Sequence, residues 1–501
     1  MAVAWNGAIR KLWLTSLCWL AGCSSLTAVG PDYAVPRAAD VMPAERWQAA
    51  LPHDGQTGAL LDWWRGFNDP LLSELLARAE ADSPSLAEAV ARIDEARSGL
   101  TTAASGHWPS LNASAKEVRN NGSAEFPMPA QTTRGVTVDA LWEIDIFGRV
   151  RRGSEAATAR LESQEHRWHA ARISLAAEVA SKYVSYRACQ LTVRAFEHDV
   201  KSRDDSARIT SNAAQAGLTA PADAHLARAG AAETASYLTA QQAACAIMLK
   251  SLVTLTGLRE ADLQQRLQAT PETLPTPAAF AVDSLPVALL AQRPDLAASE
   301  RELAAASADI GVAAANRYPR LALVGNLTRD KSSADDGPVT LSKPWSFGPT
   351  LSLPLLNGGA LASQQDAAQA RYAQAFARYR QALRSAVEEA ETALVNLDSA
   401  TRRAEHASTA SQGFKAYFQA ADQHWRAGGI SLLALEEARR SASMAERNEI
   451  ALQRDRVLHW IALYKALGGG WNAGQPRTGN TETNHAKDST RTALMTAGDA
   501  K

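Results

Sequence analysis

Long uninterrupted apolar runs are missing from this sequence of 501 residues. None reaches the roughly 18 apolar residues that a bilayer-spanning helix needs, which excludes a polytopic helical membrane protein. An excess of one charge is also missing: 52 Lys and Arg stand against 53 Asp and Glu. Nucleic acid is therefore not expected as a partner, since phosphate binding needs a clustered basic excess. Aromatic residues make up only 6% while hydrophobic residues make up 46%, which favours long, closely packed, alanine-rich helices.

Motifs of catalysis and of metal binding are absent as well. The sequence has no Walker loop, no G-x-S-x-G elbow and no H-E-x-x-H pair, so no enzyme is expected. His166 and His169 lie three residues apart on an expected helix, but no third ligand accompanies them. We interpret both as surface or packing residues, and His485 in the C-terminal tail likewise. The prediction is therefore no metal and no cofactor.

The N-terminus reads as an export signal. Residues 1–22 carry a basic pair, Arg10 and Lys11, and then a short apolar stretch. The end of this segment, Leu20-Ala-Gly-Cys23, resembles the lipobox of bacterial lipoproteins, which implies acylation of the Cys23 thiol. By the same analogy, Ser24 favours sorting to the outer membrane. A lipidated Cys23 would anchor the chain without spanning the bilayer. The alternative is an ordinary secretory signal with an incidental cysteine.

The chain repeats itself. Trp108-Pro-Ser-Leu111 matches Tyr318-Pro-Arg-Leu321, 210 residues later, and Gly148 matches Gly358 at the same offset. Gly217, in Gln215-Ala-Gly217, matches Gly428, in Arg426-Ala-Gly428, at an offset of 211. These landmarks predict a tandem duplication. The expected organisation is a lipoprotein signal peptide at 1–22, a first repeat at 23–268, a proline-rich linker at 269–286, a second repeat at 287–471, and a polar, unstructured tail at 472–501.

Each repeat contains two expected strands and one long helical hairpin. Between Val136 and Ile146, and again between Trp345 and Leu355, apolar and polar residues alternate with the period of two that is typical of a membrane β-barrel strand. A half-buried strand of a soluble sandwich is the alternative. The long stretches that follow are almost free of proline and glycine, which predicts helices of about 100 Å. The predicted strands cover about 107–119, 132–147, 318–330 and 344–356, and the hairpins about 149–258 and 359–467.

Four membrane strands cannot close a barrel, because about eight is the observed minimum. An open edge would leave backbone groups unpaired in lipid, so the chain must oligomerise if these strands cross the membrane. Two copies would give a barrel of eight strands filled by side chains, whereas three copies would give twelve strands and an aqueous channel.

Several motifs together resemble the TolC-like outer membrane factors, in the lipoprotein branch that serves tripartite RND-type efflux systems. They are Leu20-Ala-Gly-Cys23, Val29-Gly-Pro-Asp-Tyr33, Trp63-Trp64 before Phe67-Asn-Asp-Pro70, Leu141-Trp-Glu-Ile-Asp-Ile-Phe-Gly-Arg149 and Gly217-Leu-Thr-Ala-Pro-Ala-Asp223. The resemblance implies a mainly α protein with a membrane β portion. Its homotrimer would form a twelve-stranded barrel continued by an α-helical barrel. Such proteins are passive ducts in the outer membrane of Gram-negative bacteria, joined through a periplasmic adaptor to an inner-membrane transporter.

The resemblance also points to residues at the periplasmic tips of the hairpins. Acidic residues just beyond the turn glycine form the gate in this family, which makes Asp223, Glu437 and its neighbour Glu436 candidates. Ala434 stands where the second repeat would match Asp223, a departure from the family pattern. The candidates for adaptor contact are Gly217, Trp425, Arg426 and Gly428. The first repeat lacks the aromatic residue of this tip motif.

Two cysteines raise a separate hypothesis. Cys189 lies 28 residues before Gly217 and Cys245 lies 28 residues after it, so antiparallel helices turning at Gly217 place both thiols at one height. An oxidising periplasm permits a disulfide. Packed helices lie about 8–10 Å apart, however, whereas a bridge needs Cα atoms within about 7 Å. The pairing therefore stays open.

The function that the sequence favours is the outer membrane duct of an efflux pump, which carries drugs, toxic organic molecules or metal ions outward. A type I protein-secretion duct has the same fold and is one alternative. A periplasmic coiled-coil scaffold lipoprotein is another, but it would not explain the paired alternating strands beside Trp142 and Trp345.

Overall fold

The computed structural model describes residues 28–36, 63–121, 130–277, 292–334, 337–469 and 471. The predicted signal peptide, Cys23, the tail at 472–501 and positions 278–286 of the predicted linker lie outside these residues.

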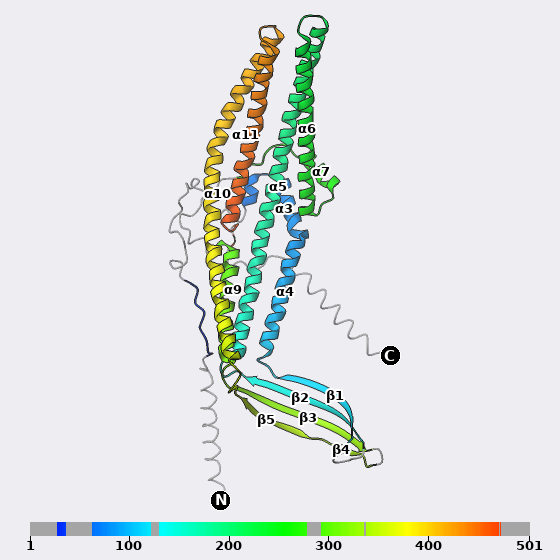
Figure 1. Cartoon of the computed structure of the whole chain (residues 1–501), viewed down its shortest axis with the longest axis vertical. Helices are drawn as coiled ribbons and strands as arrows, with labels where there is room; N and C mark the ends of the chain where they lie inside the picture. The colour runs from blue at the N-terminus through cyan, green and yellow to red at the C-terminus, as the bar shows by residue number, and fades with distance from the viewer. Residues whose placement is uncertain are drawn as a thin grey trace, which may run out of the picture.

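Two helices of equal length run the whole height of the helical part: α5 (Arg149–Gln215) and α10 (Ala360–Arg426), with 67 residues each. At 1.5 Å per residue each is about 100 Å long. Each turns at a glycine with positive φ, Gly217 or Gly428, into a return helix half as long. The return helices are α6 (Pro221–Thr256) and α11 (Leu432–Ala466), and Figure 1 shows the two hairpins side by side with their tips at one end.

The opposite half of the helical part is completed by α4 (Pro84–Ser105) and α9 (Pro294–Ala315), with 22 residues each. Both begin with proline at the first helical position, where the missing N–H costs no hydrogen bond. They pack against α5, and α9 also packs against α10 (Figure 1). The two repeats therefore share one layer of helices.

A belt surrounds the middle of α5. It consists of η3 (Trp63–Phe67), α3 (Pro70–Asp82) and α7 (Glu260–Ala269) together with the last turns of α11. Trp63 stacks on Tyr464 with ring centroids 4.9 Å apart. The buried guanidinium of Arg187 bonds the Tyr183 hydroxyl and the carbonyl of Leu267, which ties α5 to α7. This belt holds the largest cluster of buried side chains among the described residues.

An antiparallel sheet extends from the end of the helices that lies away from the tips (Figure 1). Its strands are β1 (Ser110–Asn120), β2 (Gln131–Ile144), β3 (Arg320–Ala334), β4 (Thr340–Ser342) and β5 (Trp345–Ser352). β1 pairs with β2, β2 with β3, and β3 with both β4 and β5. The β2–β3 pairing joins the two repeats.

The predicted strand bounds are corrected in three places. The sheet has five strands, because the predicted 344–356 strand is preceded by the three-residue β4. β5 ends at Ser352, two residues before Pro354. β2 ends at Ile144 and not at 147, because the Asp145 carboxylate turns away to accept hydrogen bonds from the first amides of α5.

The repeat offset is also refined. α4 and α9 are 210 residues apart, whereas α5 and α10 are 211 apart. The structural counterpart of Gly148, which starts α5 with φ 82°, is thus Gly359 with φ 86°, and not Gly358. The second repeat is therefore one residue longer than the first between these two helices.

Among the described helices, α6 alone is apolar and long enough to cross a membrane by composition. A stretch of 18 residues within α6 has a mean hydropathy of 1.2, which reflects its many alanines, and the helix packs along α5 in the hairpin.

Candidate functional site

The sheet has one apolar and one polar face. Residues paired across antiparallel strands point to the same side, so the strand register assigns each side chain to a face. The apolar face carries Leu111, Ala113, Ala115, Val136, Val138, Ala140, Trp142, Leu321, Leu323, Leu327, Trp345, Phe347 and Leu351. The polar face carries Asn112, Ser114, Thr137, Asp139, Asn326, Thr328, Ser346 and Thr350, interrupted by Leu141 and Val324. An apolar face that stays exposed over four strands is suited to lipid, and the polar face to water.

Aromatic side chains gather where the sheet meets the helices. Trp108 is 75% exposed, and the Trp142 indole donates to the carbonyl of His107 at 3.0 Å. Phe147 stacks on Tyr318 with centroids 4.7 Å apart. Tryptophan and tyrosine rings prefer the boundary between membrane and water. This group of aromatic residues at the sheet–helix joint therefore marks one such boundary.

The Trp142–Arg149 motif fixes the joint between β2 and α5. Asp145 accepts hydrogen bonds from the backbone N–H of Val150 and of Arg151, at 3.1 and 2.8 Å. Glu143 holds both nitrogens of the Arg149 fork, at 2.8 and 2.6 Å. Asp145 therefore satisfies free amides at the helix start, and Glu143 ties the Arg149 side chain back to the strand, so the two carboxylates set the direction in which α5 leaves β2.

The segment 28–36 is seated at the same joint. Gly30 packs against Gly311 of α9 so closely that a Cβ on Gly30 would lie 2.4 Å from the Gly311 Cα. Asp32 pairs with the buried Arg152 of α5 at 2.6 Å, and the Tyr33 hydroxyl donates to Glu300 of α9. Burial raises the pKa of Tyr33, and its bond to Glu300 acts in the same direction. The segment therefore clamps a helix of each repeat.

At the tips, the two turns are built alike. Gly217 and Gly428 both adopt φ above 70°, which only glycine adopts without strain. Leu218 beside the first turn is 81% exposed. Trp425 packs in a small cluster with α11, and Arg426 pairs with Asp422 at 2.8 Å. The predicted tip residues thus lie together at each turn.

The three predicted gate carboxylates occupy different surroundings. Asp223 accepts a hydrogen bond from the Thr219 hydroxyl at 2.7 Å in the first turn of α6. Glu437 is exposed and pairs with Arg440 on its own helix. Glu436 instead points into the contact between hairpins, where it pairs with Arg203 of α5 at 2.7 Å and with Arg439. The structure thus separates Glu436 from the other two.

Around Glu436 lies a network of polar residues, which we call the hairpin lock, and most of it escaped sequence analysis. Arg203 also pairs with Asp199 at 3.2 Å, and Asp199 accepts from Ser443 of α11 at 2.9 Å. Arg439, 2% exposed, donates to Ser206 of α5 at 2.7 Å, and burial lowers its pKa. A cavity of about 330 Å³ adjoins the lock between α5, α10 and α11. No periodic signal marked these residues, because they are ordinary charged residues on long helices.

Cys189 and Cys245 are joined by a disulfide in the structure, with Cα atoms 5.7 Å apart. The separation is shorter than the usual spacing of packed helices because α6 is rich in alanine along this contact, which lets the backbones approach. The bridge lies at the edge of the belt that faces the first tip, because Cys189 is two residues beyond Arg187 and Cys245 shares a cavity wall with Leu249 and with Gln264 of α7.

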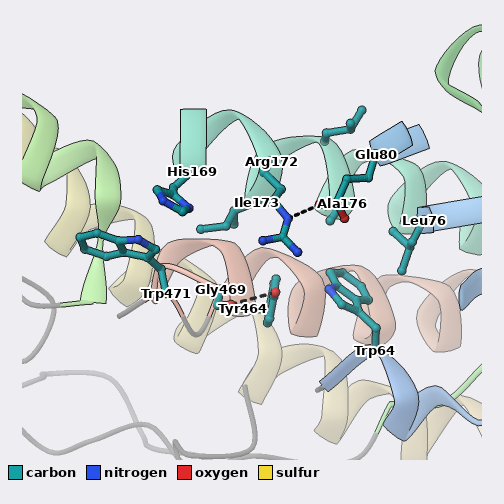
Figure 2. Close-up of a pocket in the computed structure, with 11 residues that line it drawn as sticks. Trp64, Leu76, Glu80, His169, Arg172, Ile173, Ala176, Tyr464, Gly469 and Trp471 are labelled. Atoms are coloured by element: carbon teal, nitrogen blue, oxygen red, sulfur yellow. Dashed lines mark hydrogen bonds and ion pairs between the residues drawn. The ribbon is translucent and has the colours of Figure 1, made fainter. Parts of the chain in front are cut away.

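The two predicted packing histidines lie at the belt. His166 and His169 surround the Trp471 ring, with centroids 5.3 and 6.0 Å away. Burial lowers the pKa of His166. Figure 2 shows His169 and Trp471 at one side of a cavity of about 150 Å³, with Trp64 and Tyr464 on its other walls. Within the described part of the chain, no three His, Cys, Asp or Glu residues cluster as metal ligands would.

Comparison with known proteins assigns this architecture. The family model described as outer membrane efflux protein matches twice, at residues 75–258 and 285–469. A "Nodulation protein T" of Rhizobium leguminosarum bv. trifolii is 27% identical over 90% of this chain and 96% of its own length. The "Pyoverdine export outer membrane protein OpmQ" of Pseudomonas aeruginosa is 27% identical over 93% of this chain and 98% of its own.

Solved structures agree. The outer-membrane channel OprN superposes with a TM-score of 0.78 at 28% identity, over 88% of this chain and 99% of that one. The open-state outer membrane channel MtrE of Neisseria gonorrhoeae superposes with a TM-score of 0.73 at 26% identity, over 89% of this chain and 98% of that one. These relatives are channels and not enzymes.

Proposed function

Because the chain belongs to the family of outer membrane efflux proteins, we propose that it forms a homotrimeric, lipid-anchored duct for small organic molecules. Its place is the outer membrane, and its role is that of the channel component of an efflux system. The two faces of the sheet carry this proposal, since one face suits lipid and the other suits a water-filled bore.

Three copies are favoured by the edges of the sheet. β1 and β5 each have a free edge in a single chain, whose N–H and C=O groups would be costly in lipid. Closing β5 of one chain against β1 of the next satisfies them. Four long strands per chain give twelve in a trimer, enough for an aqueous bore, whereas a dimer would be filled by its own side chains.

The seat of segment 28–36 supports acylation of Cys23. Ala28 lies against Gly148 at the joint of sheet and helices. The aromatic residues at this joint mark the membrane boundary. Cys23 is five residues earlier, so extended chain reaches no more than about 17 Å from Ala28. An acyl chain on Cys23 therefore enters the inner leaflet beside the barrel.

The tips are proposed to hold the gate and the adaptor contact. In a trimer, Asp223 and Glu437 each occur three times near the narrow end, where rings of carboxylates select cations. Gly217, Trp425, Arg426 and Gly428 form the ends that meet a periplasmic adaptor, which links the duct to an inner-membrane RND-type transporter. The hairpin lock, which includes Glu436, holds the second hairpin against α5.

Small organic cargo is favoured over secreted protein by the names of similar proteins. Those names include export of pyoverdine and efflux of solvents and toluene. A scaffold without a bore would not need a sheet with one lipid face and one water face.

The test is native mass spectrometry of protein extracted from outer membranes in mild detergent. We expect a trimer of triacylated chains that begin at Cys23, and ion conductance after reconstitution in planar bilayers. A Cys23→Ser variant should lose the acyl mass and keep the trimer. A monomer, or a dimer without conductance, would overturn the proposal.

A further inference from the structure

The apolar face of the sheet ends in a group of basic side chains. Counting away from the helices, the last apolar pair is Ala115 with Val136. Arg329 of β3 stands opposite Val136, and Lys331 stands opposite Arg134 one step further. All three basic residues lie on the lipid side of the sheet, because their register positions alternate with those of the polar face.

At this end of the sheet, which we call the rim, the basic side chains outnumber their acidic partners. Arg134 is paired with Glu117 of β1 at 2.9 Å. No ion pair joins Arg329 or Lys331 to an acidic residue among the described positions, and both side chains are exposed. The other end of the same strands is different, because there Arg149 and Arg151 are held by Glu143 and Asp145. On the lipid side of the sheet, Arg329 and Lys331 thus leave positive charge without an acidic partner, within the described part of the chain, at the end away from the helices.

The depth of Arg329 and Lys331 in the membrane determines which lipid groups they contact. The helices extend into the periplasm, so the rim lies at the outer leaflet. From Ile144 to Val136 the apolar face spans nine residues, about 26 Å along the strand, which a tilted strand needs to cross the hydrocarbon core. Arg329 stands in the last row of this span, opposite Val136, and Lys331 stands one row beyond it, so both lie at its outer end, at the depth of lipid headgroups. Charged residues there cost little, in contrast to the bilayer centre.

We propose that Arg329 and Lys331, with Arg134 beside them, form a binding surface for the phosphate groups of outer-leaflet lipid headgroups. Guanidinium and ammonium groups bind phosphate by charge-assisted hydrogen bonds. The trimer of the proposed function, on which this inference rests, repeats the surface three times around the barrel. The bound phosphates fix the depth of the barrel and screen the repulsion between neighbouring basic residues.

Lys116 offers a matched control. It lies in β1 opposite Gly135, which lies opposite Asp330, and this row belongs to the polar face. Lys116 thus has the same charge at almost the same height as Lys331, but it points to the bore.

The experiment uses the full-length trimer in neutral detergent, with melting temperature and bound-lipid mass as readouts. Lipid A with both phosphates, enzymatically dephosphorylated lipid A, and inorganic phosphate are added in turn. We expect only the phosphorylated lipid to raise the melting temperature. The double variant Arg329→Gln with Lys331→Gln should lose at least half of this rise, Lys116→Gln should keep it, and Arg329→Lys should keep most of it.

Equal stabilisation by the dephosphorylated lipid or by inorganic phosphate would overturn the proposal, as would an equal loss in Lys116→Gln. Trimer mass and conductance are measured on the same preparations. If both are normal and lipid has no effect, the headgroup surface fails while the duct stands. If both are absent, the proposed function fails first.

Discussion

The carboxylates of this chain contribute unequally to stability, and Asp145 is expected to contribute more than an exposed carboxylate because it caps α5. It accepts two backbone hydrogen bonds from the first turn of α5 and also contacts the Arg151 guanidinium. Asp145→Ala removes the helix cap, so we expect a loss of about 1 kcal/mol of stability per chain. Thermal melting of the purified trimer checks this. Asp94→Ala, which breaks only an exposed pair with Arg97 on α4, should leave the melting temperature unchanged.

The half-buried His166 at the belt gives a pH prediction. His166 is held neutral because burial lowers its pKa below the ordinary value of 6.5. In the unfolded chain it takes up a proton as the pH falls below about 6.5, whereas the folded chain does so only at lower pH. The stability of the belt should therefore decline as the pH falls from 6.5.

Melting curves between pH 7 and pH 5 measure this decline. His166→Gln should make the curve shallower, because glutamine does not titrate. His225→Gln, at an exposed site on α6, should not change the slope. An equal effect of the two variants would contradict the assignment to His166.

The sequence predicts single helices and strands well where hydrophobic periodicity, or a helix-breaking proline or glycine, determines the element. The 67-residue helices follow from the lack of proline and the glycines at their ends, and the apolar face follows from alternation. The sequence-based prediction missed β4, because three residues carry no periodic signal. It grouped Glu436 with Glu437, because adjacent positions on a helix differ by 100° in direction and only the packing partner tells which one is covered.

The first hairpin is cross-linked and this has a measurable consequence. With Cys189 bonded to Cys245 and Cys23 acylated, the denatured, unreduced mature chain should show no reactive thiol, and reduction should release two. Cys189→Ala with Cys245→Ala should fold but lose about 2–4 kcal/mol of stability, since the bridge closes a loop of 56 residues. Two thiols in the unreduced, acylated chain would show that the bridge does not form.

The second hairpin has no such bridge among its described residues, and it is held to α5 by the hairpin lock. Arg203→Gln leaves the half-buried Glu436 and the buried Asp199 with fewer partners, so the second tip should separate more readily from α5. We expect higher conductance of the reconstituted trimer. Arg402→Gln, which breaks an exposed pair within α10, serves as control and should keep the parental conductance.

At the scale of the whole molecule, duplication leaves two similar repeats that must be held in one register at the membrane boundary. The sheet does this through β2 and β3, and segment 28–36 does it from outside by contacting α5 and α9. The same segment follows the predicted acylation site. The lipid anchor and the joint between repeats are therefore connected by a few residues of chain.

Gly30 is the residue on which this connection depends most. Its φ of 98° suits glycine, and a Cβ there would lie 2.4 Å from the Gly311 backbone, so Gly30→Ala must lift the segment off α9. We expect a lower melting temperature and faster proteolytic release of the N-terminus from the trimer. Gly99→Ala on α4 is the matched control, because a Cβ at Gly99 meets no atom within 4 Å and alanine favours helix. If both variants release the N-terminus at the parental rate, the segment does not clamp the repeats, and the anchor at Cys23 is joined to the barrel only by a loose tether.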